Sequence, residues 1–396
     1  ARLRLQAMGL PGKRDEYWRY TDPASLNAPV APLAEVFNPG DESPVFDGID
    51  RLKIVFVDGV FDPAASDDLS LAGVEIERLA TAGSTDIHWA QGLYGVLEAR
   101  GQTPVPRPFA ALATSAATDG VLIRVTGHAP RPIALVYVHA SASSDAILHH
   151  CIKLETGAEL TVLESGPAAA RFTKVMEVEV GDGARFHHIR VQGRDHERRA
   201  STHVFARLGT GSLFKSFTLT ANGRQTRNEA VLELAGAHAR AHVAGAAVGD
   251  GDFHHDDTVF VTHAAEGCES RQVFKKVLKN GAVGVFQGKI LVKPGAQKTD
   301  GYQISQSLLL DDDSQFLAKP ELEIYADDVK CSHGSTSGAI DETALFYLQS
   351  RGVPRAAAQA LLVLAFLAEA IDEVENEAIA EDIRGRLEGW LARHAG

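Results

Sequence analysis

Glycine-containing turns recur at nearly constant spacing along the middle of the chain, and short runs of β-branched and apolar residues separate them. In four of these turns the glycines lie 26, 28 and 25 residues apart; they are Gly157, Gly183, Gly211 and Gly236. A strand-and-turn unit of this length cannot bury its apolar face alone and gains stability by stacking on its neighbours. The spacing therefore predicts stacked β-coils, a solenoid, rather than a meander of hairpins.

Strand-like segments fill the intervals between the turns, for example over 158–163, 175–180 and 186–191. Periodicity alone also leaves a β-sandwich or a β-barrel open. The pattern of residues changes on both sides of this stretch, from short β-branched runs to helical patterns, which predicts three regions. They are a mixed, largely helical region over 1–118, a β core over 119–338 and a helical region over 339–396.

The C-terminal region has clear helix boundaries. A helix is predicted over 341–350, with Gly352 placed to end it and Pro354 suited to the first turn of the next helix. That second helix has the apolar density of a packed helix over 355–374, and a short acidic helix over 377–393 closes the chain.

The N-terminal region contains a short strand-like segment over 52–57 and an aromatic element over 16–22. The aromatic element carries Tyr17, Trp18 and Tyr20 among charged residues. Because aromatic side chains mostly pack against other apolar groups, we interpret it as an anchor on the main body of the protein rather than a partner-facing patch.

Composition limits the classes of function. A formal net charge of -13 argues against binding to nucleic acid, whose phosphates attract cations. The most apolar stretch, 356–371, is interrupted by polar residues and too short to span a bilayer, so we expect no membrane association. Three widely spaced cysteines fit reduced thiols in the cytoplasm better than a disulfide framework. They are Cys151, Cys268 and Cys331.

The segment 320–338 carries the most chemistry, because it sets a cysteine and a histidine beside acidic residues. If 321–333 is one extended strand, alternation predicts two faces. One holds Glu323, Asp327, Cys331 and His333, and the other holds Leu322, Ile324 and Ala326. A thiolate and an imidazole two residues apart can bind one metal ion or exchange a proton. A small buried thiol beside a surface histidine would explain the pair equally simply.

Several motifs together resemble the SufB/SufD family of iron-sulfur cluster assembly scaffolds, and within it the SufD branch. They are the string from Asp327 to Gly334, the Glu-x-Trp-x-Tyr-Thr element from Glu16 to Thr21, and the stretches 255–263, 283–306 and 344–352. Departures from the family pattern are mild, at Ser335, Ser337 and Ala339. The resemblance implies a right-handed parallel β-helix and a non-catalytic scaffold subunit.

An iron-sulfur cluster is generally held by four side chains, mostly thiolates, whereas Cys331 and His333 are only two. A cluster bound here would be transient and shared with a partner subunit. The resemblance implies that this partner is a SufB-type paralogue, and it favours His333 as the iron or cluster ligand with Cys331 beside it. Asp327 and Asp328 are candidates for supporting these ligands.

The resemblance also implies that a SufC-type ABC ATPase docks on the C-terminal helical region, where Tyr347, Arg351 and Phe366 are the candidate contacts. The sequence leaves open whether the isolated chain forms a homodimer, which type of cluster is built, and whether a flavin binds the complex.

Two other classes of function are considered. In a Cys-His enzyme acting on a small substrate, His333 would activate Cys331 for nucleophilic attack. A polysaccharide-active or purely structural β-helix would present acids and aromatic residues along one face, but only 7% of the residues are aromatic.

Other candidate metal ligands are weaker. Histidine pairs occur at 149–150, 187–188 and 254–255, but adjacent residues on a strand point to opposite faces and cannot chelate one ion together. We interpret these histidines as surface residues of the solenoid, and Cys151 and Cys268 as packing residues.

Overall fold

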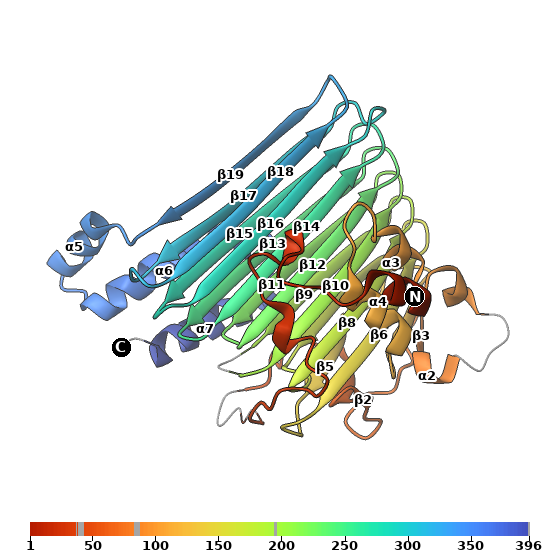
Figure 1. Cartoon of the computed structure of the whole chain (residues 1–396), viewed down its shortest axis with the longest axis horizontal. Coiled ribbons are helices and arrows are strands. Elements are labelled where there is room, and N and C mark those ends of the chain that lie inside the picture. Colours follow the sequence, from red (N-terminus) through yellow and green to blue (C-terminus); the bar gives the residue numbers. More distant parts are fainter. Residues whose placement is uncertain (37, 39–42, 83–87, 194–195, 395–396) are drawn as a thin grey trace.

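The computed structural model describes residues 1–396 except 37, 39–42, 83–87, 194–195 and 395–396. Its strands form two facing sheets of parallel coils, the predicted parallel β-solenoid with helical regions toward both ends of the chain (Figure 1). The ten-stranded sheet contains β1 (Leu52–Val57), β2 (Val60–Phe61), β5 (Ile133–Val138), β7 (Glu159–Ser165), β9 (Arg185–Gln192), β11 (Leu213–Ala221), β13 (Arg240–Asp250), β15 (Glu269–Lys279), β17 (Asp300–Leu309) and β19 (Lys330–Gly338). The nine-stranded sheet contains β3 (Val74–Arg78), β4 (Val121–Val125), β6 (Asp145–Leu154), β8 (Arg171–Val180), β10 (Arg199–Leu208), β12 (Gln225–Leu234), β14 (His254–His263), β16 (Val283–Val292) and β18 (Gln315–Ile324).

Six of the turns that lead from the nine-stranded to the ten-stranded sheet share one backbone device. In each, a residue with positive φ donates its N–H to a carbonyl oxygen of the following coil, over 2.6 to 2.9 Å. These residues are Gly157, Gly183, Gly211, His238, Gly267 and Lys298. Three of the four predicted turn glycines therefore occupy the left-handed position. Gly236 does not; it is required because a Cβ there would lie 2.1 Å from the backbone nitrogen of Thr210.

The histidine pairs are not surface residues. His149, His150, His188 and His255 are all buried. For the first pair, the opposite orientation of neighbours is confirmed: the His150 ring bonds to the Tyr137 hydroxyl of the facing sheet, 3.0 Å away, while His149 points to the outer face. The interpretation as surface histidines is wrong because two stacked sheets with helices outside bury both faces of the strands.

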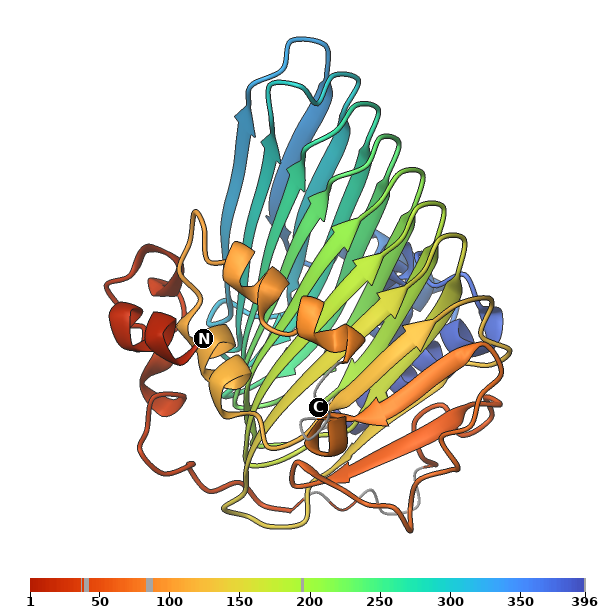
Figure 2. The same cartoon turned by 90° about the vertical axis from the view of Figure 1, so that its right-hand side faces the viewer.

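The N-terminal region is hydrogen-bonded into the solenoid, since β1 pairs in parallel with β5 and β3 pairs antiparallel with β4. Its helical segments lie over the nine-stranded sheet, whereas the C-terminal helices lie on the opposite side of the molecule (Figure 2). The segments are α1 (Arg2–Met8), η1 (Glu16–Trp18), η2 (Pro23–Ser25), α2 (Leu79–Ala82), η3 (Trp89–Gly92), α3 (Val96–Arg100) and α4 (Pro108–Ala116).

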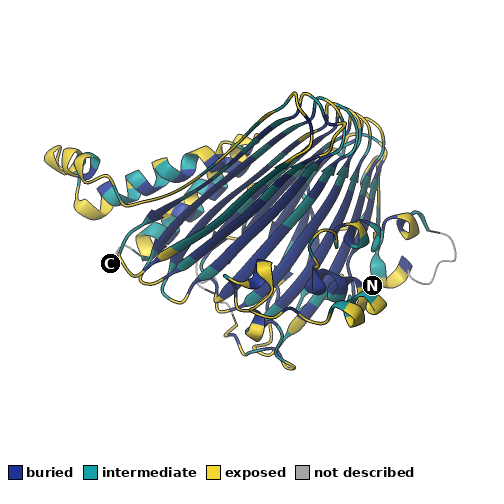
Figure 3. Ribbon diagram, turned by 45° about the horizontal axis from the view of Figure 1, so that its top comes forward, coloured by how far each residue is buried: buried dark blue, intermediate teal, exposed yellow. Residues whose placement is uncertain are grey.

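The C-terminal helices are α5 (Glu342–Ser350), α6 (Arg355–Ile371) and α7 (Glu377–Arg393). The Asp341 carboxylate caps α5, and Gly352 follows it with φ +88°, as predicted. α6 ends three residues earlier than expected, and Pro354 caps it instead of entering its first turn. α6 and α7 bury an apolar stripe on the ten-stranded sheet, whereas α5 is largely exposed (Figure 3). Within the described ranges, no helix combines the length and apolarity that crossing a bilayer requires.

Replacing Gly183 by alanine tests the turn device. Gly183 has φ +67° and a Cβ would meet nothing within 4 Å, so Gly183→Ala adds only the cost of a left-handed alanine. The expected loss is about 1 kcal/mol in the free energy of unfolding, measured by urea denaturation. Gly295→Ala is the matched control, because its surroundings are equally open and its φ is not positive; it should lose no stability. Equal losses in both variants would contradict this account.

Candidate functional site

The last coil of the solenoid is open. Among the strands that the structure describes, β18 and β19 end their sheets, each pairing with a neighbour on one side only (Figure 1). A free strand edge carries unpaired N–H and C=O groups, which are ready to pair with a strand of another chain.

Cys331 and His333 lie on β19, at this open edge. Cys331 is in register with Gly301 and His333 with Gln303, so the two side chains share one face of the strand, as predicted. Cys331 is half-buried and His333 is exposed. The pair therefore combines an accessible imidazole with a partly shielded thiol.

The composition of that face differs from the prediction. Residues 321–333 are not one strand, because β18 ends at Ile324 and the chain turns before β19 begins at Lys330 in the other sheet. Cys331 consequently packs in an apolar cluster with Leu322 and Ala326, which we expected on the opposite face. Glu323 instead forms an ion pair with Lys289, 2.5 Å away, on the neighbouring strand β16.

Polar residues lie next to His333 in the last coils. Gln303 is fully buried and donates to the Gln272 side chain over 2.8 Å, while its own carbonyl oxygen has no hydrogen-bond partner among the described residues. Further along, the hydroxyl groups of Ser305 and Ser335 lie 3.0 Å apart. The open coil thus offers polar groups beside the imidazole.

The electrostatic surroundings keep the Cys331 thiol protonated. Burial raises the pKa of this thiol. A hydrogen bond from the backbone N–H of Gly301 lowers the pKa in part, and the nearby Asp300 carboxylate raises it further. No hydrogen bond between Cys331 and His333 occurs in the part of the chain that the structure describes. An imidazole that activates the thiol as a nucleophile would require that contact.

Asp327 and Asp328 lie in the exposed turn between β18 and β19. Asp328 forms an ion pair with Lys298, and its backbone carbonyl accepts the turn hydrogen bond from that residue. Asp328 thus helps to close the turn. Within the described residues, no ion pair joins either aspartate to His333.

The aromatic element near the N-terminus holds the open end, which confirms the anchor. Tyr17 and Trp18 are buried. The Tyr17 carbonyl accepts hydrogen bonds from Arg227 (2.8 Å) and Gln287 (3.0 Å), and its hydroxyl bonds to the Glu321 carboxylate on β18. The segment therefore crosses from β12 to the last strand of the nine-stranded sheet.

Buried ion pairs lie beneath the aromatic element and contact it. Glu229 accepts from Arg227 over 2.8 Å and from Arg107 over 2.9 Å. Burial by itself would raise the pKa of Glu229, but Arg227 first, with His203 and Arg107, lowers it to about 2. The Thr21 hydroxyl donates to Asp256, 2.6 Å away, which also pairs with Arg227. Each of these four charges, on Arg107, Arg227, Glu229 and Asp256, therefore has a partner of opposite sign.

The structure separates the three predicted docking residues. Tyr347 lies on exposed α5 and Arg351 directly follows this helix, with the guanidinium 5.1 Å from the ring centre. Phe366 is half-buried on α6, beneath Lys275 of the ten-stranded sheet. Sequence reasoning missed Phe346 and Leu361, which are 72% and 51% exposed. Phe346 stands in the same motif as Tyr347, but the motif does not reveal which face of the helix is free.

Comparisons with known proteins agree in their description of the chain. A family model described as the SufBD core domain of SUF system FeS cluster assembly matches residues 137–366, from β5 into α6. The iron-sulfur cluster assembly protein SufD of Escherichia coli (strain K12) is 29% identical over 97% of this chain and 90% of its own length. SufD of Bacillus subtilis (strain 168) is 28% identical over 65% of this chain and 60% of its own. A SufBD family protein of Synechocystis is 26% identical over 97% of this chain and 87% of its own.

Alkylation of Cys331 distinguishes a shielded thiol from an activated one. Because burial raises its pKa, iodoacetamide at neutral pH should modify Cys331 more slowly than free cysteine, whose pKa is about 8.5. The rate of alkylation should rise only when the pH exceeds about 8.5, the pKa of free cysteine, and His333→Ala should leave this rate unchanged. Peptide mass spectrometry measures each site, with buried Cys268 as the unreactive control. Fast modification that depends on His333 would instead support the Cys-His enzyme.

Proposed function

The chain belongs to the SufB/SufD family of the SUF system, and from that premise we propose that it is a scaffold subunit on which an iron-sulfur cluster is built and then passed to apo-proteins. Membership of this family supports a role in iron-sulfur cluster assembly. The observation that carries the scaffold role is the position of His333 and Cys331 on the unpaired edge of the last coil.

An incomplete set of ligands at a free edge suits a transient cargo. A cluster generally needs four ligands, and this site offers one accessible imidazole and one partly shielded thiol. A SufB-type paralogue whose own strands pair with β18 and β19 would bring the remaining ligands to the same place. The cluster would then be held only while the two subunits are joined. In the isolated chain, a second copy can occupy the same edge, which would give a homodimer.

The residues of the site have different roles in this proposal. His333 binds iron through its imidazole, because it is exposed and faces the polar coil. Cys331 must lose its proton before it can bind iron or sulfide, so it acts once a partner or a metal ion lowers its pKa. Asp327 and Asp328 place carboxylates in the turn before the site, where they can support a bound iron ion.

A SufC-type ABC ATPase is proposed to dock on the C-terminal helical region. The exposed residues of α5 and α6 support this, since Phe346, Tyr347 and Leu361 present a large apolar area to solvent and Arg351 lies beside it. We propose that 1–118 covers the first end of the solenoid and anchors the open end through the segment around Tyr17, that 119–338 carries the cluster site, and that 339–396 receives the ATPase. The complex would work in the cytoplasm, and the chain itself would catalyse no turnover.

Substituting His333 tests the cluster site. In the complex reconstituted with SufB-type and SufC-type subunits, His333→Ala should leave folding and complex formation unchanged, because the side chain is exposed. Cluster formation from Fe²⁺ and sulfide, followed by visible absorption, should be lost. His128→Ala, at another exposed histidine, is the matched control and should assemble clusters normally. Cluster formation at the control rate in His333→Ala would contradict the assignment.

Substitutions on α5 test the docking surface. Phe346→Ala and Tyr347→Ala should each weaken ATPase binding by roughly 1–2 kcal/mol, a fivefold to thirtyfold change by isothermal titration calorimetry. Neither should shift Tm, because both side chains are exposed. Phe366→Ala should lower Tm instead, since its ring packs against the sheet. Unchanged binding in both α5 variants would place the ATPase elsewhere.

A further inference from the structure

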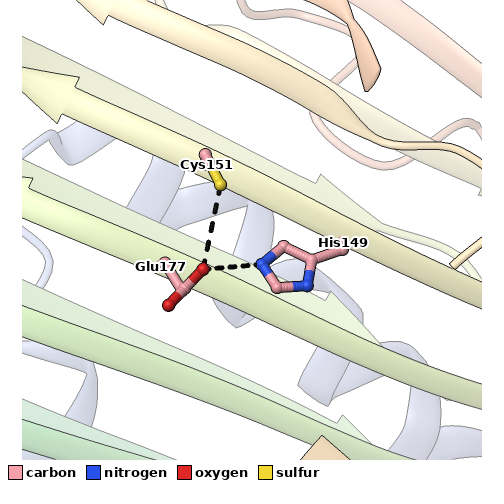
Figure 4. Close-up of side chains that lie close together, drawn as sticks. All are labelled: His149, Cys151 and Glu177. Carbon is pink, nitrogen blue, oxygen red and sulfur yellow. Dashed lines mark hydrogen bonds and ion pairs between the residues drawn. The ribbon is translucent and has the colours of Figure 1, made fainter. Parts of the chain in front are cut away.

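A second group of metal-binding side chains lies near the other end of the solenoid. Among the described residues, His149, Cys151 and Glu177 form a group of three potential ligands (Figure 4). His149 and Cys151 are two residues apart on β6, and Glu177 stands on β8 in register with Cys151. All three are fully buried on the outer face of the nine-stranded sheet, far along the stack of strands from β19.

The donor atoms of the group converge on one point. His149 Nε2 lies 2.8 Å and Cys151 Sγ 3.9 Å from the same oxygen, Oε2 of Glu177, and all three atoms lie within 4.8 Å of one another. Imidazole nitrogen, thiolate sulfur and carboxylate oxygen are the ligands that Zn²⁺ takes, and imidazole and thiolate also suit Fe²⁺. We propose that His149, Cys151 and Glu177 form a buried binding site for a divalent transition-metal ion, Zn²⁺ or Fe²⁺, separate from the cluster site.

Neighbouring groups hold the ligands in position. The Glu177 carboxylate accepts the backbone N–H of Gly95 on Oε2 (2.5 Å) and that of Glu98 on Oε1 (2.8 Å). The Tyr94 ring stacks on the His149 ring with their centres 4.1 Å apart. Partners of this kind fix the orientation of ligands before a metal arrives. One lone pair of Oε2 remains for the ion, because the Gly95 N–H occupies only the other.

Charge balance favours an ion in this buried place. Binding replaces the thiol proton of Cys151, which is released to solvent, and uses His149 through Nε2, with the imidazole proton on Nδ1. The thiolate and the Glu177 carboxylate then neutralise the two positive charges of the ion.

A purely structural role for these three side chains accounts for Glu177 but not for His149 and Cys151. Glu177 alone would suffice to bind the two backbone N–H groups at the start of α3. That role requires neither the imidazole nor the thiol, and a thiol 3.9 Å from a carboxylate forms only a weak hydrogen bond. The interpretation of Cys151 as a packing residue accounts for its burial but not for the convergence of three different donors.

Co²⁺ and Zn²⁺ titrations of the whole chain test the proposal. The reduced, chelator-stripped protein receives metal both in its native state and during refolding, because the buried ligands slow entry. One equivalent of Co²⁺ should give the sulfur-to-cobalt charge-transfer absorption of a thiolate ligand, and Zn²⁺ should displace it. Cys151→Ala should lose this absorption and bind Zn²⁺ at least tenfold more weakly. Cys331→Ala, the control at the cluster site, should keep both.

Several outcomes would overturn the site. One is the absence of charge-transfer absorption in the unmodified chain after refolding with Co²⁺. Another is Zn²⁺ binding of equal strength in Cys151→Ala. Absorption lost in Cys331→Ala instead would place the metal at the open end and separate this proposal from the proposed function. If Cys151→Ala fails to fold, Cys151→Ser keeps the side-chain size, and Glu177→Gln removes only the ligand charge; unchanged Co²⁺ spectra in both would also refute it.

Discussion

Backbone hydrogen bonding between successive parallel coils is the constraint on which the rest of the structure depends. Each coil satisfies the N–H and C=O groups of the coil before it, so the stack needs a different solution at each end. At the first end, β1 and β3 from the N-terminal region pair with the sheets. At the last end the edges stay open, and the candidate cluster site lies there. The same bonding that builds the solenoid thus leaves the unpaired edge at which the proposed partner would pair.

A segment near the N-terminus packs against the open end and holds it in place. The segment around Tyr17 reaches β18 after crossing strands that carry buried, paired charges. Removing one member of such a group would leave its partner buried and uncompensated, which is far more costly than losing an exposed ion pair. The N-terminal segment and the last coil therefore stabilise each other in space, although most of the chain separates them in sequence.

Two kinds of site suit two kinds of metal binding. The pair at the open edge has few ligands and solvent access, which favours a cargo that must leave. The buried group on β6 and β8 has three ligands, fixed neighbours and balanced charge, which favours a resident ion. Separation along the solenoid allows both to exist without competing for the same ion, since opposite ends of the stack carry them.

The sequence by itself determined the C-terminal helices and the position of Cys331 and His333 on one face of a strand, because these follow from local signals: helix caps and the two-residue period of a strand. The spacing of the turn glycines favoured a solenoid, and the family resemblance favoured it over a β-sandwich or a β-barrel. Only the tertiary structure decided that Cys331 points into an apolar cluster, since a turn moves the chain to the other sheet. It also decided that Cys151 meets Glu177. Strand register brings together residues from different coils, and register depends on packing along the whole stack rather than on any short stretch of residues.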